Sequence, residues 1–143
     1  MYPEGSCFHE AGHAVVAYSL GLSVDAVRVR MDDASGGTDN CCCSALLPFI
    51  DQLAIVLAGA VSEAIFKKQS HPVGSARDHA RIIKLLTGIS EEQGDILRAA
   101  GRKRAPELLM TYEHAAVRVA ERLIACGHID AAEFGALMRG TNA

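Results

Sequence analysis

The first twenty residues carry apolar side chains at helical spacing. Phe8, Ala11 and Val15 lie three or four positions apart, which places them on one face of an α-helix. The pattern predicts a helix from about Ser6 to Leu20, capped by the serine hydroxyl at its start. Gly21 follows at the position where a left-handed residue commonly ends a helix.

A small β element is predicted next. Apolar and charged residues alternate from Val24 to Met31, as they do in a strand with one buried face. Asp33 to Asn40 has the composition of a loop, with two adjacent glycines at its centre. Cys41 to Leu46 is expected to form a second short strand, so that the two strands make a hairpin or a small sheet.

The rest of the chain has helical patterns. Pro48 suits the first turn of a helix that is expected to reach Lys67 or Lys68 and, being apolar on several sides, to be the central buried helix. A further helix is predicted from Ser75 to Leu86. Another begins at a Ser90–Gln93 capping box, and its pattern is interrupted at Gly101 and Pro106. A long helix is predicted from Glu107 to Cys126, followed by a short one to Met138 that begins at an Asp130–Glu133 capping box. The expected fold class is mainly α with a small β element (α+β), in a single domain over residues 1–143.

Composition and charge narrow the class of protein. Half of the 143 residues are hydrophobic and only 5% are aromatic, so the core must consist mainly of aliphatic side chains, which favours closely packed helices. A net charge of −3 does not suggest a nucleic-acid partner, which would call for a basic face. No apolar stretch is long enough to span a bilayer and no signal peptide opens the chain, so the expected location is cytoplasmic.

The cysteines do not form a recognisable framework. There are five, three of them consecutive from Cys41 to Cys43, and no CxxC pair occurs. An odd number at such spacing suits neither disulfides nor a thiolate cage. We expect reduced thiols.

Residues His9 to His13 read HEAGH, an HExxH pattern on the predicted first helix. Residues four apart share a helix face, so both imidazoles can reach one metal ion. Glu10 lies beside the first of them and can act as general base on a water at an open metal position. The expected cofactor is one Zn²⁺ per chain, although such a site also accepts other divalent ions.

A catalytic zinc site needs a third protein ligand. The candidates in the sequence are Asp78, His79, His71, Glu63, His114 and His128. Asp78 also fits a helix cap, because it stands three residues after Ser75. Glu63 lies in an apolar helix, where a carboxylate is costly unless it is paired or ligates something, so it is either a ligand or an acceptor for a ligand N–H. The two later histidines favour surface or packing roles.

Four stretches of the sequence form an ordered set. They are FHEAGHAVVA (Phe8 to Ala17), LAGAVSEAIF (Leu57 to Phe66), GSARD (Gly74 to Asp78), and a tail with Glu107 to Leu109, His114, Val119 to Ile124 and His128 to Asp130. In this set the chain resembles the peptidase domain of the FtsH-type AAA zinc proteases. Order and spacing agree from about Phe8 to Met138.

The resemblance implies that Asp78 is the third zinc ligand and that Glu63 is a nearby acidic residue that supports the site. It implies a zincin-like, mainly helical peptidase fold whose edge strand binds an extended substrate by β-addition. The matching strand would be Val27 to Met31 or Cys41 to Leu46. The implied activity is that of a zinc-dependent metalloendopeptidase that acts on peptides or unfolded protein.

The chain also departs from that family. It has no GxxxxGK[ST] phosphate loop, the Pro-Arg-Gly turn after the first strand is missing, and Ala64 replaces the second glutamate of an Ala-Glu-Glu segment. We therefore expect a domain that cleaves peptides or unfolded segments by itself, works with a separate ATPase, or is part of a longer chain. A homo-oligomer is one further option. The alternative function is a non-catalytic metal-binding or protein-interaction domain derived from such a protease.

Overall fold

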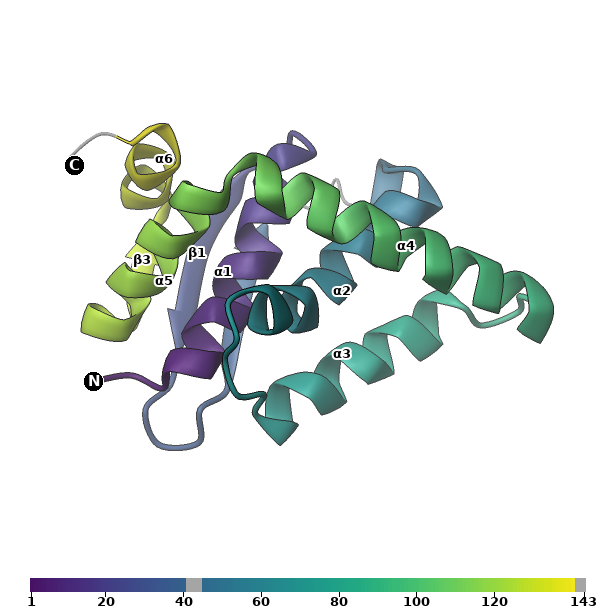
Figure 1. Ribbon diagram of the computed structural model, residues 1–143, viewed down its shortest axis with the longest axis horizontal. Helices are drawn as coiled ribbons and strands as arrows, with labels where there is room; N and C mark the ends of the chain where they lie inside the picture. The colour runs from purple at the N-terminus through teal and green to yellow at the C-terminus, as the bar shows by residue number, and fades with distance from the viewer. Residues whose placement is uncertain (41–44, 141–143) are drawn as a thin grey trace.

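Helix α1 (Glu4–Ser19) runs through the centre of the molecule (Figure 1). A computed structural model describes residues 1–40 and 45–140 of the chain. In it α1 contacts the sheet, α2 (Phe49–Ile65) and α5 (Glu113–Cys126). All α1 residues from Ser6 to Ala17 are buried, because small and aliphatic side chains on every side let the neighbouring elements approach closely.

The central position of α1 corrects one expectation. The helix that follows Pro48 was expected to be the central one, but α2 buries only part of its surface, including Leu53 and Glu63. Its apolar character on several sides reflects two partners, since α2 packs between α1 and α4 (Glu91–Thr111). The apolar residues on several sides of α2 therefore indicated that it has more than one neighbouring helix. They did not show that it is the most buried helix.

Three antiparallel strands form a sheet in the order β2-β1-β3, made of β1 (Val24–Val29), β2 (Gly36–Asn40) and β3 (His128–Asp130). The first strand was predicted. The loop expected from Asp33 to Asn40 is wrong from Gly36 onward, because β2 pairs with β1 there. Since β1 has partners on both sides, it is not the edge strand at which β-addition was expected. The expected strand from Cys41 falls largely on residues 41–44, which lie outside the described part of the chain.

Apart from β3, the elements of the second half of the chain are helices. Helix α3 (Pro72–Leu85) begins before the predicted Ser75, and α4 continues through Gly101 and Pro106, where an interruption was expected. Gly101 is buried against α2, where an added Cβ would lie 3.1 Å from Leu53 Cβ. The glycine thus allows α4 to pack closely against α2.

Helix α6 (Ala131–Arg139) closes the chain, and its start follows local rules. Asp130 Oδ1 accepts the Glu133 N–H at 2.8 Å, and Ser90 Oγ accepts the Gln93 N–H at 3.2 Å, so both predicted capping positions are confirmed. The fold class expected from the sequence, mainly α with a small β element, is confirmed as well. Within residues 1–40 and 45–140, no helix is long and apolar enough to cross a membrane.

Candidate metal centre

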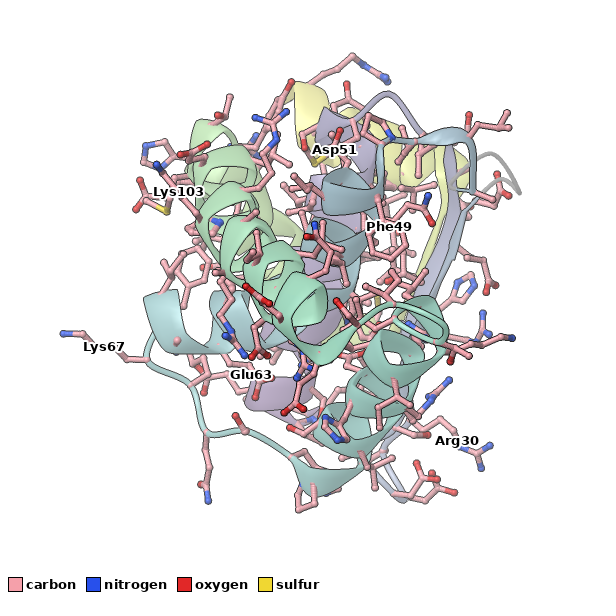
Figure 2. The ribbon with its side chains drawn as sticks, turned by 90° about the vertical axis from the view of Figure 1, so that its right-hand side faces the viewer. Arg30, Phe49, Asp51, Glu63, Lys67 and Lys103 are labelled. Carbon is pink, nitrogen blue, oxygen red and sulfur yellow. The ribbon has the colours of Figure 1, made fainter. Side chains whose placement is uncertain are left out.

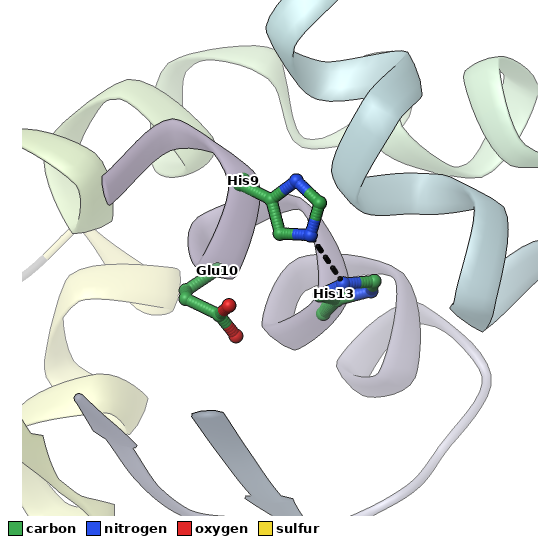
Figure 3. A group of neighbouring side chains, drawn as sticks. All are labelled: His9, Glu10 and His13. Atoms are coloured by element: carbon green, nitrogen blue, oxygen red, sulfur yellow. Dashed lines mark hydrogen bonds between the residues drawn. The ribbon is translucent and has the colours of Figure 1, made fainter. Parts of the chain in front are cut away.

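His9 and His13 face each other one turn apart on α1. Their Nε2 atoms lie 3.1 Å apart, and the two rings meet edge to face with centroids 4.7 Å apart. Figure 3 shows both rings, with the Glu10 carboxyl group beside them on the same side of the helix. Both imidazoles are buried, so the pair occupies the interior and not the surface.

Two glycines make room for this ring pair. A Cβ on Gly12 would lie 2.5 Å from the carbonyl oxygen of Ala58, so the glycine lets α2 cross directly over α1. A Cβ on Gly59 would lie 2.5 Å from His9 Nε2 and 2.7 Å from His13 Nε2. Gly59 was not singled out from the sequence, where nothing marks it as facing the histidines.

Helix α3 brings Asp78 to the two histidines. Asp78 Oδ2 lies 2.7 Å from His9 Nε2 and 3.1 Å from His13 Nε2. Asp78 is the buried residue of α3. It does not cap the helix, because α3 starts at Pro72 and the cap is His71, whose Nδ1 accepts the Val73 N–H. The capping alternative for Asp78 is therefore wrong.

The far side of each imidazole is held by an oxygen atom. His9 Nδ1 is hydrogen-bonded to Oε1 of the fully buried Glu63, and His13 Nδ1 lies 2.7 Å from the carbonyl oxygen of Ile55. Figure 2 shows Glu63 within the body of the molecule, whereas Lys67 on the following turn extends away from it. A carbonyl and a carboxylate accept hydrogen bonds, so both rings carry a hydrogen on Nδ1.

This arrangement leaves three lone pairs pointing at one another. With hydrogens on Nδ1, the Nε2 atoms of His9 and His13 are acceptors when the rings are neutral, and Asp78 Oδ2 is a third acceptor. Buried acceptors without a donor are unfavourable, so the cluster needs a cation or a proton at its centre. Glu10 and Glu63 add two further buried carboxyl groups, and buried charges of this kind are paired or bind metals.

The pKa values of His9 and Asp78 are both shifted in the direction that favours a positive charge between these two groups. Burial alone would lower the pKa of His9, but the carboxylates of Asp78 and Glu63 raise it to about 10. Burial alone would raise the pKa of Asp78, but its close contacts with His13 and His9 hold it well below its usual range. A proton on His9 and a divalent ion would thus occupy the same place, because His9 Nε2 cannot bind both.

The three ligand atoms fit zinc in type and in spacing. Zinc–nitrogen and zinc–oxygen distances of about 2.0–2.2 Å separate tetrahedral ligand atoms by roughly 3.3 Å. The separations between His9, His13 and Asp78 are 2.7–3.1 Å, so binding would move the atoms apart by roughly 0.2–0.6 Å. Two imidazoles and one carboxylate also form the ligand set of several catalytic zinc sites.

Glu10 lies on the open side of this cluster. His9, Glu10 and His13 each place a possible ligand atom within 4.8 Å of the others. Thr38 Oγ1 on β2 donates to Glu10 Oε1 at 3.2 Å, which ties the carboxyl group to the sheet. The adjoining niche, of about 10 Å³, has room for roughly one water molecule.

Of the other candidate ligands, His71 lines a small niche beside His9, Glu10 and Glu63, and the rest lie away from the centre. His79, His114 and His128 are exposed, and His71 caps α3. The structure therefore brings together His9, Glu10, His13, Asp78 and Glu63, the five site residues named from the sequence. The roles of Thr38 and the Ile55 carbonyl had no sequence signal, because backbone oxygens and a lone threonine on a distant strand leave no motif. No protein-family model and no curated protein sequence matches this chain.

Proposed function

We propose that this chain is a zinc-dependent metallopeptidase domain in which His9, His13 and Asp78 hold the metal. The observation that carries the proposal is the convergence of two imidazole Nε2 atoms and one carboxylate oxygen within 2.7–3.1 Å. Their hydrogen-bonded outer sides leave only lone pairs toward the centre. Such a cluster is stabilised by a divalent cation, and three protein ligands leave a fourth position open.

Each of the chain's own residues has a defined task in this proposal. Bound zinc would lower the pKa of a coordinated water to about 7 and polarise the scissile carbonyl. Glu10 accepts a proton from the attacking water and delivers it to the leaving amine nitrogen. Thr38 holds the Glu10 carboxyl group through its 3.2 Å hydrogen bond, and Glu63 fixes the His9 ring and its tautomer.

Strand β2 is the element best placed to bind a substrate. It is an edge strand among the described residues, and Thr38 links its middle to Glu10. Arg77 Nη1 donates to the Gly36 carbonyl at 2.6 Å, which ties the start of the strand to α3. An extended peptide or unfolded segment could therefore add to β2 and pass its backbone in front of the centre.

Glu10→Gln tests the proposal because it keeps the size of the side chain and removes the base. Zinc-loaded wild-type protein should hydrolyse casein or a quenched fluorescent peptide. The variant should be slower by about 10²–10⁴-fold, with unchanged zinc content by elemental analysis. Equal rates in the two proteins would contradict the role of Glu10. Bound zinc without hydrolysis by the wild type would favour a non-catalytic metal-binding domain.

A further inference from the structure

A groove lies beside the candidate centre, between β2, α2 and α3. Its volume is about 490 Å³, within the roughly 300–1,000 Å³ that is common for ligand sites. The described residues that line it are Thr38, Gln52, Ile55, Val56, Arg81, Lys84 and Leu85. A groove of this size can accept at least one large side chain of a bound peptide.

Three contacts join the groove to the centre. Its lining residue Thr38 donates to Glu10, and the carbonyl oxygen of its lining residue Ile55 lies 2.7 Å from His13 Nδ1. Arg81 Nη1 lies 3.8 Å from Asp78 Oδ1. A peptide whose backbone reached the centre would therefore place a neighbouring side chain in this groove.

The lining combines an apolar floor with positive charge. Ile55, Val56 and Leu85 supply aliphatic surface, while Arg81 and Lys84 lie three residues apart on one side of α3. Among the described lining residues there is no carboxylate, although the whole chain has a net charge of −3. This local excess of positive charge is the reverse of the overall balance.

Arg81 is not fully occupied by its ion pair. The 3.8 Å separation from Asp78 Oδ1 is longer than a hydrogen bond, and Asp78 Oδ2 is directed at the histidines. Half of the Arg81 side chain is exposed (52%). Lys84 stands in the last turn of α3, where it interacts with the helix dipole and still reaches solvent.

We infer that this groove selects peptides with an aspartate or glutamate close to an apolar residue beside the cleaved bond. The inference rests on the proposed peptidase function for the nature of the ligand. Arg81 and Lys84 would pair with the acidic side chain, and the floor formed by Ile55, Val56 and Leu85 would receive the apolar one.

Peptide binding tests this without hydrolysis. Zinc-loaded Glu10→Gln protein is titrated, by fluorescence anisotropy, with labelled peptides that contain one leucine and carry Glu, Gln or Lys at each neighbouring position in turn. At one or more positions the Glu peptide should bind about tenfold more tightly than the Lys peptide, and this ratio should fall as salt screens the pair. The double charge reversal Arg81→Glu with Lys84→Glu should invert the order of affinities.

Two further variants serve as controls. Arg81→Gln with Lys84→Gln should remove the preference without inverting it, and its thermal melting should match that of the parent protein. Lys103→Glu changes a lysine on α4 that does not line the groove (Figure 2) and should leave the order unchanged.

The possible results separate the inference from the proposed function. Absence of binding, absence of a Glu preference at every position, or a preference that survives the charge reversal would overturn the inference. Lack of hydrolysis by zinc-loaded wild-type protein contradicts the proposed function instead, because the affinity order is measured in a protein that lacks the base.

Discussion

His9 Nε2 and Asp78 Oδ2 lie 2.7 Å apart, although they come from the first and the third helix. The contact joins a ring on the most buried helix to a carboxylate on a much more exposed one. His13 Nε2 lies 3.1 Å from the same oxygen, so a single atom of Asp78 faces both rings. Either a proton on His9 or a cation at the centre of the three groups would satisfy this arrangement.

Asp78→Asn should lose zinc while Glu10→Gln keeps it. Asparagine has the same shape but lacks the charge that balances a divalent ion. Changing a residue that only hydrogen-bonds to a metal ligand lowers affinity by roughly 10–100-fold. Changing a ligand itself should cost more, so we expect zinc affinity to fall by at least about 100-fold. Competition with a chromophoric chelator measures this. If Glu10→Gln lost the metal and Asp78→Asn retained it, Glu10 and not Asp78 would be the third ligand.

Glu63 should act on the metal through His9. Glu63→Gln retains an acceptor for the Nδ1 hydrogen and removes the charge, whereas Glu63→Leu leaves that buried hydrogen unpaired. Zinc affinity should therefore decrease in the order wild type, Gln, Leu, with a loss of about 10–100-fold for the glutamine variant. Chelator competition gives the affinities, and thermal melting of the metal-free variants separates this effect from unfolding. An unchanged affinity in both variants would assign Glu63 a packing role.

The stability of the metal-free protein should fall as pH rises from about 6.5 to about 10. The pKa of His9 is raised from 6.5 to about 10 in the folded protein, where the carboxylates of Asp78 and Glu63 outweigh burial. The folded state therefore keeps a proton that the unfolded state releases above pH 6.5. The stabilisation by this proton is complete below pH 6.5 and is lost as pH passes through the folded pKa.

Thermal melting of chelator-treated protein across this pH range checks the prediction. The His9→Gln variant is the control, because its melting temperature should change less over the same interval. Zinc affinity of the wild type should rise across that interval, since the metal must displace the His9 proton. A melting temperature of the metal-free wild type that increased with pH would contradict the assigned protonation.

Gly59→Ala should damage the centre without changing any polar group. The added Cβ would lie 2.5 Å from His9 Nε2 and 2.7 Å from His13 Nε2, so the rings or α2 must shift. We expect weaker zinc binding and a lower melting temperature. Gly94→Ala is the matched control, because its Cβ would meet only Leu86 Cδ1 at 3.8 Å and alanine favours a helix by up to about 1 kcal/mol. Equal behaviour of the two variants would show that the ring pair tolerates displacement.

The sequence predicted features that depend on neighbouring residues better than features that depend on packing. The Asp130–Glu133 cap is a contact within one turn, and the HEAGH spacing brings two histidines together on any helix. Both therefore appear in the structure as predicted. By contrast, α3 begins at Pro72 and not at the expected Ser75, and Asp78 contacts the histidines instead of closing a Ser75–Asp78 capping box.

Other differences arise from tertiary contacts that leave no local pattern. Residues Gly36 and Gly37 favour a loop, yet pairing with β1 makes them part of a strand. Pro106 lies inside α4 because burial of Leu109 and Ala105 on the same helix outweighs the local cost. Asp78 was one of six candidate ligands until the resemblance favoured it. Residue spacing could not choose among them, because the contact between α3 and α1 links segments distant in the chain.

The weak attachment of α3 has a consequence for how the two binding regions depend on each other. Asp78 is the only buried residue of this fully described helix, and Val73 and Ile83 are exposed on it. A helix with so little buried apolar surface opens readily, so an ion shared by Asp78 and α1 would supply much of its anchorage. Removal of the ion should then speed amide hydrogen exchange throughout α3 and loosen the wall that carries Arg81. Recognition and reactivity would be lost together, and a metal-depleted chain could not retain a substrate that it was unable to cut.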